Sequence, residues 1–338
     1  MMRIGEGAHA YEWIDNWAVY PDTGDAAEGW VHPGMAFGRD GSIYTSHPGR
    51  PEILVYDRAG KLQNSWKADA VEIHNLVLVE ENGREYLWVT DNGAKRFKDI
   101  GYEYRKDSSG AAGQVLKFDV GGTLALRLDM PALPDYAGAR WSPTAVAVNQ
   151  ERFGGNGDVW VADGYGKSYV HRYDKAGTYL GSLNGEDGAG RFSCPHGILI
   201  DVRKSEPELY VADRANSRVQ VYDTAGRFRR VFGQDHLKKP SCFVVAGNDL
   251  IVGDLSARLS VFDSADRFVC HLGDNLPVCA RPGWPNALDG QGARVRPAVL
   301  EAGKFNSPHG LTADPAGNLY IAEWLIGGRM IKLNRLAA

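Results

Sequence analysis

Residues 192–232 contain four short apolar runs separated by turn-forming residues. The runs are GILI, ELYVAD, RVQVYD and FRRVF, and Gly, Asn, Asp, Ser and Pro cluster between them. Runs rich in Val, Ile, Tyr and Phe between such clusters are typical of β-strands. Four strands in about 40 residues form one antiparallel meander, which is the size of one blade of a β-propeller.

The same order of runs recurs along the chain, and this repeat constrains the fold. Six copies occupy about 30–67, 70–129, 141–184, 191–234, 237–274 and 304–336. The last copy lacks a fourth strand, and residues 10–20 (AYEWIDNWAVY) are apolar and strand-like enough to supply it. Pairing the two chain ends closes the ring and removes free sheet edges. The sequence therefore predicts an all-β, six-bladed β-propeller, a single domain over residues 1–338 closed by an N-terminal strand.

Composition argues against several function classes. Charged residues make up 24% of the chain, the net charge is −4, and no block of like charge occurs. We therefore expect neither nucleic acid nor a membrane as a partner. The start, MMRIGEGAHAYEW, lacks the basic and apolar segments of a signal peptide. The four cysteines show no CxxC spacing, so we expect free thiols and a cytoplasmic location. The oligomeric state is left open.

Histidine recurs at one position of the repeat. Aligned on the start of the first strand, the second, fourth and sixth repeats have His74, His196 and His309. The other repeats have Thr144, Ser241 and Pro33-Gly34 there, with His32 one step earlier. Alternate blades of a six-bladed ring lie about 120° apart, so the three imidazoles are expected to converge on the axis.

Three histidines with an open coordination position form the ligand set of a catalytic zinc site. Zn²⁺ is the first candidate, although imidazole also suits Fe, Ni, Cu or Co. A structural alternative exists, because Pro-His-Gly at a strand start also recurs in propellers that only bind other proteins. There the histidine caps the strand or hydrogen-bonds a neighbouring blade.

The second strands end in acidic residues, and different side chains follow them. The acidic residues are Asp91, Asp163, Asp213, Asp254 and Glu323. Their recurrence predicts a structural role, a carboxylate that accepts backbone N–H groups of the adjacent turn. The loops after the second strands carry Tyr165, Arg214, His47, Arg50, Lys95, Arg96 and Trp324.

These loops are expected on the same rim as the histidines, so we predict catalytic roles for four of their residues. Tyr165 is the candidate general base. Arg214 is the candidate contact for a carboxylate or an oxyanion. His47 and Arg50 are the candidates from the first blade. Alternatively, either Tyr165 or Arg214 is an ordinary residue of this rim with no catalytic role. The long loops 95–113 and 275–304 are expected to line the sides of the site.

The PHG-type motifs, DGY at Tyr165 and ADR-x-N-x-R at Arg214 resemble the NHL-repeat propeller of peptidyl-α-hydroxyglycine α-amidating lyase. The resemblance covers the second to sixth blades. It implies a zinc held by the three histidines, with Tyr165 as base and Arg214 as substrate contact. The family's C–N cleavage would make the substrate an α-hydroxyglycine-like carbinolamide.

Three departures from that family are visible. Gly310 stands where the family has an aspartate for a structural Ca²⁺, so this second cofactor is disfavoured. Gly166 stands where a disulfide cysteine follows the tyrosine. The family's first-blade arginine has no clear match, and His47 or Arg50 occupies that loop.

The first functional hypothesis is a metal-dependent lyase acting on C–N or C–O bonds, with a hydrolase as second choice. Its substrate would be a small hydroxylated molecule. The alternative is a non-catalytic NHL-type propeller that binds a protein or ligand on one rim through exposed aromatics such as Trp284 and Trp324. A calcium-dependent lactonase-like propeller fits less well, because Ca²⁺ prefers oxygen ligands and the axial positions are histidines.

Overall fold

The computed structural model describes residues 2–104 and 112–337. The chain forms two compact units. Unit 1 comprises Met1–Ala68, Lys95–Ser108 and Val244–Ala338, and unit 2 comprises Asp69–Ala94 and Ser109–Phe243. The prediction of a single domain with the blade boundaries given above stays a prediction.

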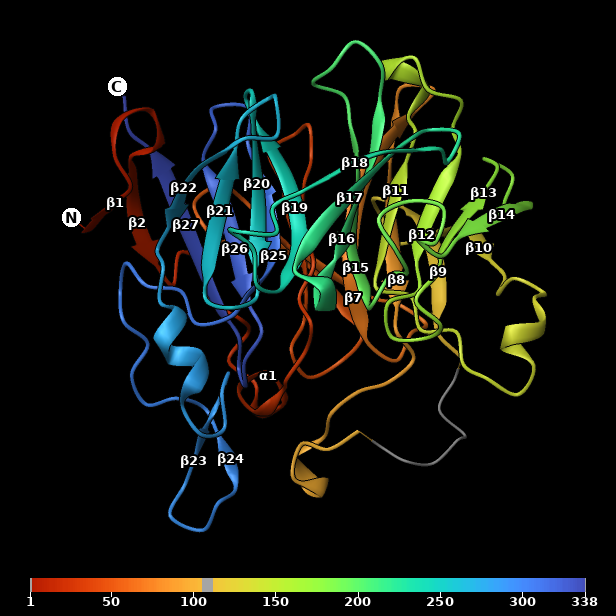
Figure 1. Cartoon of the computed structure of the whole chain (residues 1–338). Helices are drawn as coiled ribbons and strands as arrows, with labels where there is room; N and C mark the ends of the chain where they lie inside the picture. Colours follow the sequence, from red (N-terminus) through yellow and green to blue (C-terminus); the bar gives the residue numbers. More distant parts are fainter. Residues whose placement is uncertain (1, 105–111, 338) are drawn as a thin grey trace. The chain divides into compact units, whose positions relative to one another are not determined.

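The fold is an all-β six-bladed β-propeller, as the repeat predicts. The described residues form six antiparallel sheets, five of four strands and one of five, and a separate two-stranded hairpin (Figure 1). Each four-stranded sheet keeps the order of the chain, so each repeat is one meander.

The strands that make up the blades are as follows. The first sheet contains β3 (Met35–Phe37), β4 (Ile43–Ser46), β5 (Glu52–Tyr56) and β6 (Leu62–Lys67). The second contains β7 (Ile73–Glu81), β8 (Arg84–Asp91), β9 (Gln114–Asp119) and β10 (Leu124–Leu128). The third contains β11 (Ala145–Val148), β12 (Val159–Ala162), β13 (Val170–Tyr173) and β14 (Tyr179–Leu183). The fourth contains β15 (Pro195–Asp201), β16 (Glu208–Asp213), β17 (Arg218–Asp223) and β18 (Phe228–Phe232). The fifth contains β19 (Pro240–Ala246), β20 (Asp249–Asp254), β21 (Arg258–Phe262) and β22 (Phe268–Leu272).

The sixth sheet is completed from the other end of the chain. It contains β25 (Pro308–Ala313), β26 (Leu319–Glu323), β27 (Arg329–Arg335), β2 (Tyr11–Asp15) and β1 (Met2–Ile4). β2 pairs antiparallel with β27, with Tyr11 opposite Arg335 and Asp15 opposite Ile331. The predicted closing strand is confirmed, and β1 extends the sheet by one further strand that the repeat gave no reason to expect.

Short helices and one hairpin lie in the connections. They are α1 (Gly24–Glu28), η1 (Gly7–His9), η2 (Lys98–Ile100), η3 (Pro134–Tyr136), η4 (Glu151–Phe153), η5 (Arg214–Asn216), η6 (Leu276–Ala280) and the hairpin β23 (Ala287–Leu288) with β24 (Arg294–Val295). The hairpin projects beyond the sheets of unit 1 (Figure 1). Residues 105–111 of the predicted loop 95–113 lie outside the described residues. That the loops 95–113 and 275–304 line the sides of the site stays a prediction.

Burial explains the apolar runs of the middle strands. In β16, the side chains of Leu209, Tyr210, Val211 and Ala212 are all fully buried, although they point alternately to the two faces of the sheet. The outer strand β18 is less covered, with Arg229 exposed, three residues partly buried and only Phe232 buried. A strand that is covered on both faces has a continuous run of apolar residues in its sequence, whereas in a strand covered on one face apolar and polar residues alternate.

Aspartates fix the tight turns between the outer strands. Asp223 Oδ1 accepts hydrogen bonds from the backbone N–H groups of Ala225 and Arg227 at 3.0 and 2.9 Å. Gly226 in this turn has φ +91°, a left-handed value that glycine adopts without strain. The same Asp-x-x-Gly turn follows β5, β9 and β13, which explains why Asp and Gly punctuate the repeat.

The acidic residues that end the second strands are structural, as predicted. Asp91 accepts hydrogen bonds from the backbone N–H groups of Val71, Glu72 and Gly93 at 2.8–2.9 Å. Other strand ends make corresponding bonds, with Asp163 accepting from the Ser142 amide at 2.7 Å. The carboxylates of Asp91, Asp163, Asp213 and Glu323 therefore tether the chain that enters the first strand of their own blade.

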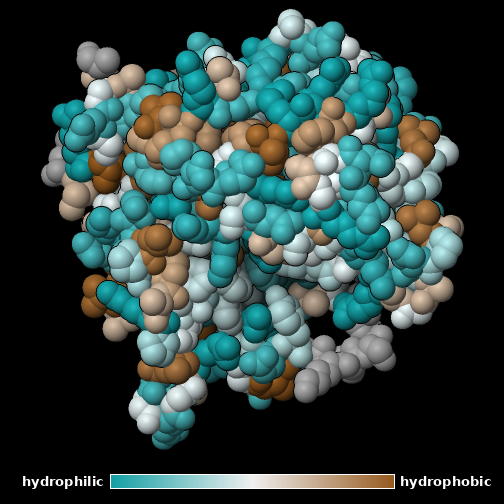
Figure 2. All heavy atoms as spheres, viewed as in Figure 1, coloured by the Kyte–Doolittle hydropathy of each residue, from teal (hydrophilic) through white to brown (hydrophobic). Residues whose placement is uncertain are grey.

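Three further features of the described residues are the length of the helices, the hydropathy of the surface and the state of the cysteines. No helix among the described residues is long and apolar enough to cross a membrane. On the face drawn in Figure 2, hydrophilic residues predominate and hydrophobic ones are scattered. Cys194, Cys242, Cys270 and Cys279 are free thiols.

Candidate functional site

Two of the predicted histidines lie side by side in unit 2. His74 is in β7 and His196 is in β15, and both side chains are only 1% exposed. Their ring centres are 4.9 Å apart. The β-strands that carry them thus bring together two imidazoles that are 122 residues apart in the sequence.

A backbone carbonyl fixes the tautomer of each ring. His74 Nδ1 lies 2.7 Å from the Thr144 carbonyl oxygen, and His196 Nδ1 lies 2.8 Å from that of Ser241. A carbonyl oxygen can only accept, so each Nδ1 carries the proton and each Nε2 carries the lone pair. Thr144 and Ser241 occupy the position equivalent to the histidines in the following repeats.

Tyr165 and Arg214 join this pair. The Tyr165 hydroxyl lies 3.1 Å from His196 Nε2, and because that nitrogen carries the lone pair, the hydroxyl donates. Arg214 Nη1 donates to the same hydroxyl oxygen at 3.2 Å. The tyrosine ring also packs edge-on against His74, at 5.3 Å between centres.

The electrostatics of Tyr165 are set mainly by burial. Burial raises the pKa of the Tyr165 hydroxyl, and the positive charge of Arg214 opposes that rise. The hydroxyl is therefore protonated at neutral pH in the metal-free protein. It can act as a base only if a further positive charge is present beside it.

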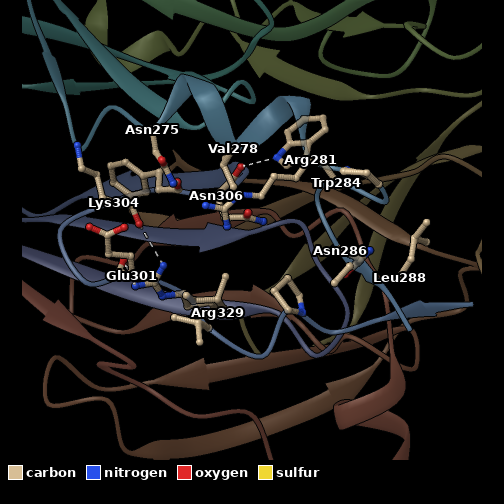
Figure 3. Close-up of a pocket in the computed structure, with 16 residues that line it drawn as sticks. Asn275, Val278, Arg281, Trp284, Asn286, Leu288, Glu301, Lys304, Asn306 and Arg329 are labelled. Atoms are coloured by element: carbon tan, nitrogen blue, oxygen red, sulfur yellow. Dashed lines mark hydrogen bonds between the residues drawn. The ribbon is translucent and has the colours of Figure 1, made fainter. Parts of the chain in front are cut away.

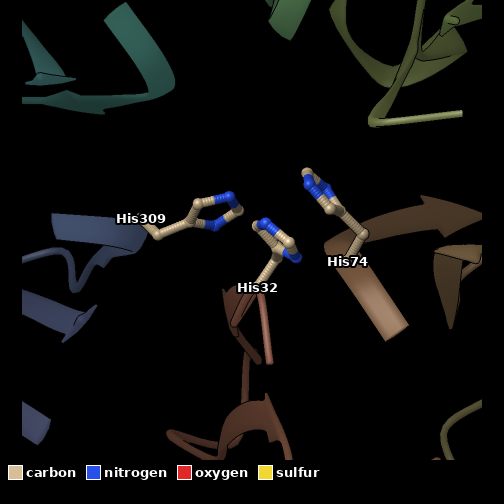
Figure 4. Close-up of side chains that lie close together, drawn as sticks. All are labelled: His32, His74 and His309. Carbon is tan, nitrogen blue, oxygen red and sulfur yellow. The ribbon is translucent and has the colours of Figure 1, made fainter. Parts of the chain in front are cut away.

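Unit 1 contains a second pair of imidazoles. His32 and His309 have ring centres 5.2 Å apart (Figure 4). His309 Nδ1 donates to the Pro33 carbonyl oxygen at 3.0 Å, which again leaves the lone pair on Nε2. The His32 ring stacks on Trp324 with a centre distance of 5.1 Å. Figure 4 also draws His74, which belongs to unit 2.

Glycine after the histidine makes these hydrogen bonds possible. A Cβ atom at Gly310 would lie 2.7 Å from the Pro33 oxygen, and one at Gly197 would lie 2.6 Å from the Ser241 oxygen. These are the same two carbonyls that hold the histidines. An aspartate side chain at 310 would therefore displace the strand that orients His309.

We expect Gly310→Ala to lower stability by about 1–3 kcal/mol, because the added methyl overlaps backbone atoms that cannot move independently. The control is Gly290→Ala, where a Cβ meets nothing within 4 Å. Thermal denaturation of the two variants tests this, and equal melting temperatures would contradict the close approach.

The ring spacings suit a shared metal ion. A tetrahedral Zn²⁺ about 2.0–2.1 Å from two ring nitrogens puts the imidazole centres roughly 5 Å apart. The observed separations within the two pairs are 4.9 and 5.2 Å. Histidines that ligate metals usually donate their other N–H to a carbonyl or carboxylate, as His74, His196 and His309 do. The residues therefore fit a metal.

Comparison with known proteins finds sequence similarity to NHL-repeat proteins. No family model matches it. Human NHL repeat-containing protein 3 is 28% identical over 237 residues, which cover 66% of this chain and 61% of that protein. A probable peptidyl-alpha-hydroxyglycine alpha-amidating lyase of Caenorhabditis elegans, pgal-1, is 27% identical over 175 residues, covering 50% of this chain and 42% of that protein. The chain is therefore similar in sequence to NHL-repeat proteins. It spans about three fifths of the length of the human relative.

Solved structures of lyases share the fold. A streptogramin B lyase structure aligns over 98% of this chain and 99% of its own, with a TM-score of 0.59 and 15% identity. Virginiamycin B lyase from Staphylococcus aureus aligns over 96% of this chain, with a TM-score of 0.53 and 12% identity. At these identities the likeness establishes the propeller fold of this chain and nothing more.

The first-blade candidates have local partners in unit 1. His47 is fully buried, and its Nδ1 accepts hydrogen bonds from the backbone N–H groups of Gly49 and Arg50 at 3.0 and 3.3 Å. Burial lowers the pKa of His47, and Arg50 adds to the effect. Arg50 itself is ion-paired with Asp25 at 2.8 Å and with Glu52. Their catalytic roles stay predictions.

Sequence reasoning named His32 without selecting it as a ligand, and it missed Glu72. His32 precedes the repeat position by one residue, so an alignment on that position does not select it. Glu72 precedes His74 by two residues, is 1% exposed, and adds to the rise in the pKa of Tyr165. Glu72 could have been selected from the sequence, because it is a carboxylate among apolar residues in the segment DAVEIH, immediately before the first strand.

Proposed function

We propose that the protein is a metal-dependent lyase, or secondarily a hydrolase, acting on a small hydroxylated substrate. His74, His196 and His309 are the proposed ligands, and His32, whose ring lies beside that of His309 in unit 1, is a fourth candidate. Zn²⁺ is the proposed metal, and a structural Ca²⁺ is not part of the proposal, because Gly310 leaves no room for the acidic side chain.

One observation carries the proposal. Three histidines on alternate repeats use Nδ1 in the same way, each donating to a backbone carbonyl. Capping alone does not explain why a tyrosine hydroxyl and an arginine gather at the Nε2 side of His196. A ligand set with a proton-carrying group and a cation beside it explains both.

A bound metal of this kind supplies a positive charge that polarises an oxygen and lowers the pKa of groups near it. The residues of the chain have separate tasks. The Tyr165 hydroxyl lies 3.1 Å from His196 Nε2, and a metal ion held by that nitrogen would take the place of this hydrogen bond, after which the hydroxyl would exchange its proton with the substrate. Arg214 donates to the Tyr165 oxygen, which stabilises a phenolate, and its positive charge suits a substrate carboxylate. His47 and Arg50 are weaker candidates, since both are engaged locally.

A screen tests the activity. The metal-loaded protein is incubated with small hydroxy-amides, hydroxy-acids and lactones, and product release is followed for each class. The account predicts turnover of a hydroxy-amide, such as a carbinolamide, and its loss after chelation. Turnover confined to lactones would support the hydrolase choice, and no turnover in any class would contradict both.

We expect Tyr165→Phe to lower kcat by about 10²–10⁴-fold, the usual contribution of a positioned proton-transfer group. Metal content should be unchanged, because the phenyl ring keeps the packing against His74. Arg191→Gln, an exposed change in unit 2, serves as control. Unchanged kcat in Tyr165→Phe would reject the tyrosine as the proton carrier.

The alternative is a non-catalytic NHL-type propeller that binds a protein or ligand. It accounts for the Nδ1 hydrogen bonds, since a structural histidine can bond a neighbouring repeat in this way. It predicts no bound metal and unchanged partner binding after histidine replacement. The four free cysteines favour a reducing compartment for either function, and we propose the cytoplasm.

A further inference from the structure

The acidic residues that end the second strands are stabilised differently in different blades. Three of them form ion pairs with an arginine, namely Asp213 with Arg218 at 2.8 Å, Asp254 with Arg258 at 3.5 Å and Glu323 with Arg329 at 3.3 Å. Arg329 also lines a cavity of unit 1 (Figure 3). Asp163 in the third blade is fully buried and forms no ion pair with any residue that the structure describes. A buried carboxylate without a cation has to be stabilised by hydrogen bonds.

Hydroxyl and imidazole groups take the place of the arginine beside Asp163. The Tyr136 hydroxyl donates to Asp163 Oδ2, because a carboxylate can only accept. The Tyr136 oxygen then accepts from His171 Nε2 at 2.8 Å. His171 Nδ1 therefore carries the lone pair and accepts from the Ser182 hydroxyl at 2.7 Å. Burial lowers the pKa of His171 to about 3, so the imidazole is neutral and this chain of hydrogen bonds carries no positive charge.

The same carboxylate holds the turn that carries Tyr165. Asp163 Oδ2 accepts from the Lys167 backbone N–H at 2.7 Å, and the Asp163 carbonyl oxygen accepts from the Ser168 N–H at 3.0 Å. These two bonds close a turn with Tyr165 inside it. Gly166 packs directly against the carboxylate, because a Cβ atom there would lie 2.2 Å from both carboxylate oxygens. The place of the carboxylate therefore determines the course of the turn.

We propose that Tyr136 and His171 are positioning residues for Tyr165. They hold the Asp163 carboxylate where it closes the turn, and through it they keep the Tyr165 hydroxyl beside His196 Nε2, at 3.1 Å. All five residues belong to unit 2, and the coupling does not depend on a metal ion. Its consequence for turnover rests on the proposed function, in which Tyr165 exchanges a proton with the substrate.

The side-chain nitrogen resonances of the histidines test the coupling without a substrate. The full-length protein with ¹⁵N-labelled histidine is measured in EDTA, and the His196 signals are identified by their absence from His196→Ala. In the wild type, the hydrogen bond from Tyr165 moves the Nε2 resonance of His196 away from that of an unbonded lone pair. We expect Tyr136→Phe, which removes the donor to Asp163, to move this resonance back toward the unbonded value.

A second variant and a control show where the effect comes from. Gly166→Ala places a methyl group against the carboxylate and should move the same resonance, which keeps the test valid where Tyr136→Phe does not fold. Tyr173→Phe is the matched control. Tyr173 is 1% exposed, lies in the same blade, and donates its hydroxyl to the Asp129 carbonyl oxygen at 2.8 Å. Its replacement removes a buried hydrogen bond of the same kind and should leave the His196 resonance in place.

Turnover of a substrate found in the screen tests the consequence. We expect Tyr136→Phe to lower kcat by roughly 10–100-fold, because small misplacements of a reacting group have effects of this order. KM should stay unchanged, because the proposed substrate contact Arg214 is not altered. Tyr173→Phe should retain the kcat of the wild type.

Two results would overturn the proposal. One is a His196 resonance that stays in place in both Tyr136→Phe and Gly166→Ala, and the other is an equal movement of that resonance in Tyr173→Phe. A His196 resonance that moves only in the first two variants, while kcat does not change, would support the coupling. That last result would count against Tyr165 as the proton carrier, and so against the proposed function instead.

Discussion

Replacing His196 by alanine is expected to weaken metal binding by roughly 100-fold or more. Four-ligand zinc sites contribute about 10–16 kcal/mol in total, so one ligand is worth roughly 3 kcal/mol. The variant also frees the Ser241 carbonyl and removes the acceptor of the Tyr165 hydroxyl. Competition titration against a chromophoric chelator measures the affinity directly and needs no knowledge of the substrate.

His236→Ala is the matched control, because it removes a partly exposed histidine of the same unit that is outside the pair. Its metal affinity should equal that of the wild type. His74→Ala and His309→Ala are expected to behave like His196→Ala. Full affinity in any one of these three would remove that residue from the proposed ligand set.

Replacing Arg329 by methionine is expected to cost about 3–5 kcal/mol, because it leaves a buried carboxylate without its counter-ion. Arg329 is 2% exposed and bonds Asp15 at 2.7 Å and Glu323 at 3.3 Å. Asp15 lies in the closing strand β2, and Glu323 ends β26. Burial raises the pKa of Glu323 even with the arginine present, so loss of the arginine favours its protonation.

The expected fall in melting temperature is about 4–7 °C. Arg267→Met is the control, since Arg267 pairs with Asp263 on the surface, and exposed pairs contribute at most about 1 kcal/mol. If the melting temperature of Arg329→Met falls no further than that of the control, the pairing of the closing strand β2 with the sixth sheet does not depend on this ion-pair cluster.

The blades could be predicted from the sequence because each repeat carries its own pattern. Apolar runs such as ELYVAD follow from burial on both faces, and the Asp-x-x-Gly turns follow from local hydrogen bonds. The closing strand was predictable because the sixth repeat lacked one. β1 and the hairpin β23–β24 were not, since neither belongs to the repeat and both are short.

The histidines were predictable as a set, but their chemistry was not. The repeat gave the positions of His74, His196 and His309, whereas the choice of Nδ1 as donor depends on carbonyls 45 to 276 residues away in sequence. His32 was noted but not chosen as a ligand, because an alignment on the strand start considers one position only.

The metal content of the purified wild-type protein tests the central claim most directly. Elemental analysis of protein purified without chelator should find about one transition-metal ion per chain, and Zn²⁺ in the first instance. Folded protein that contains no such ion, and that takes up none when Zn²⁺ is supplied, would contradict the account.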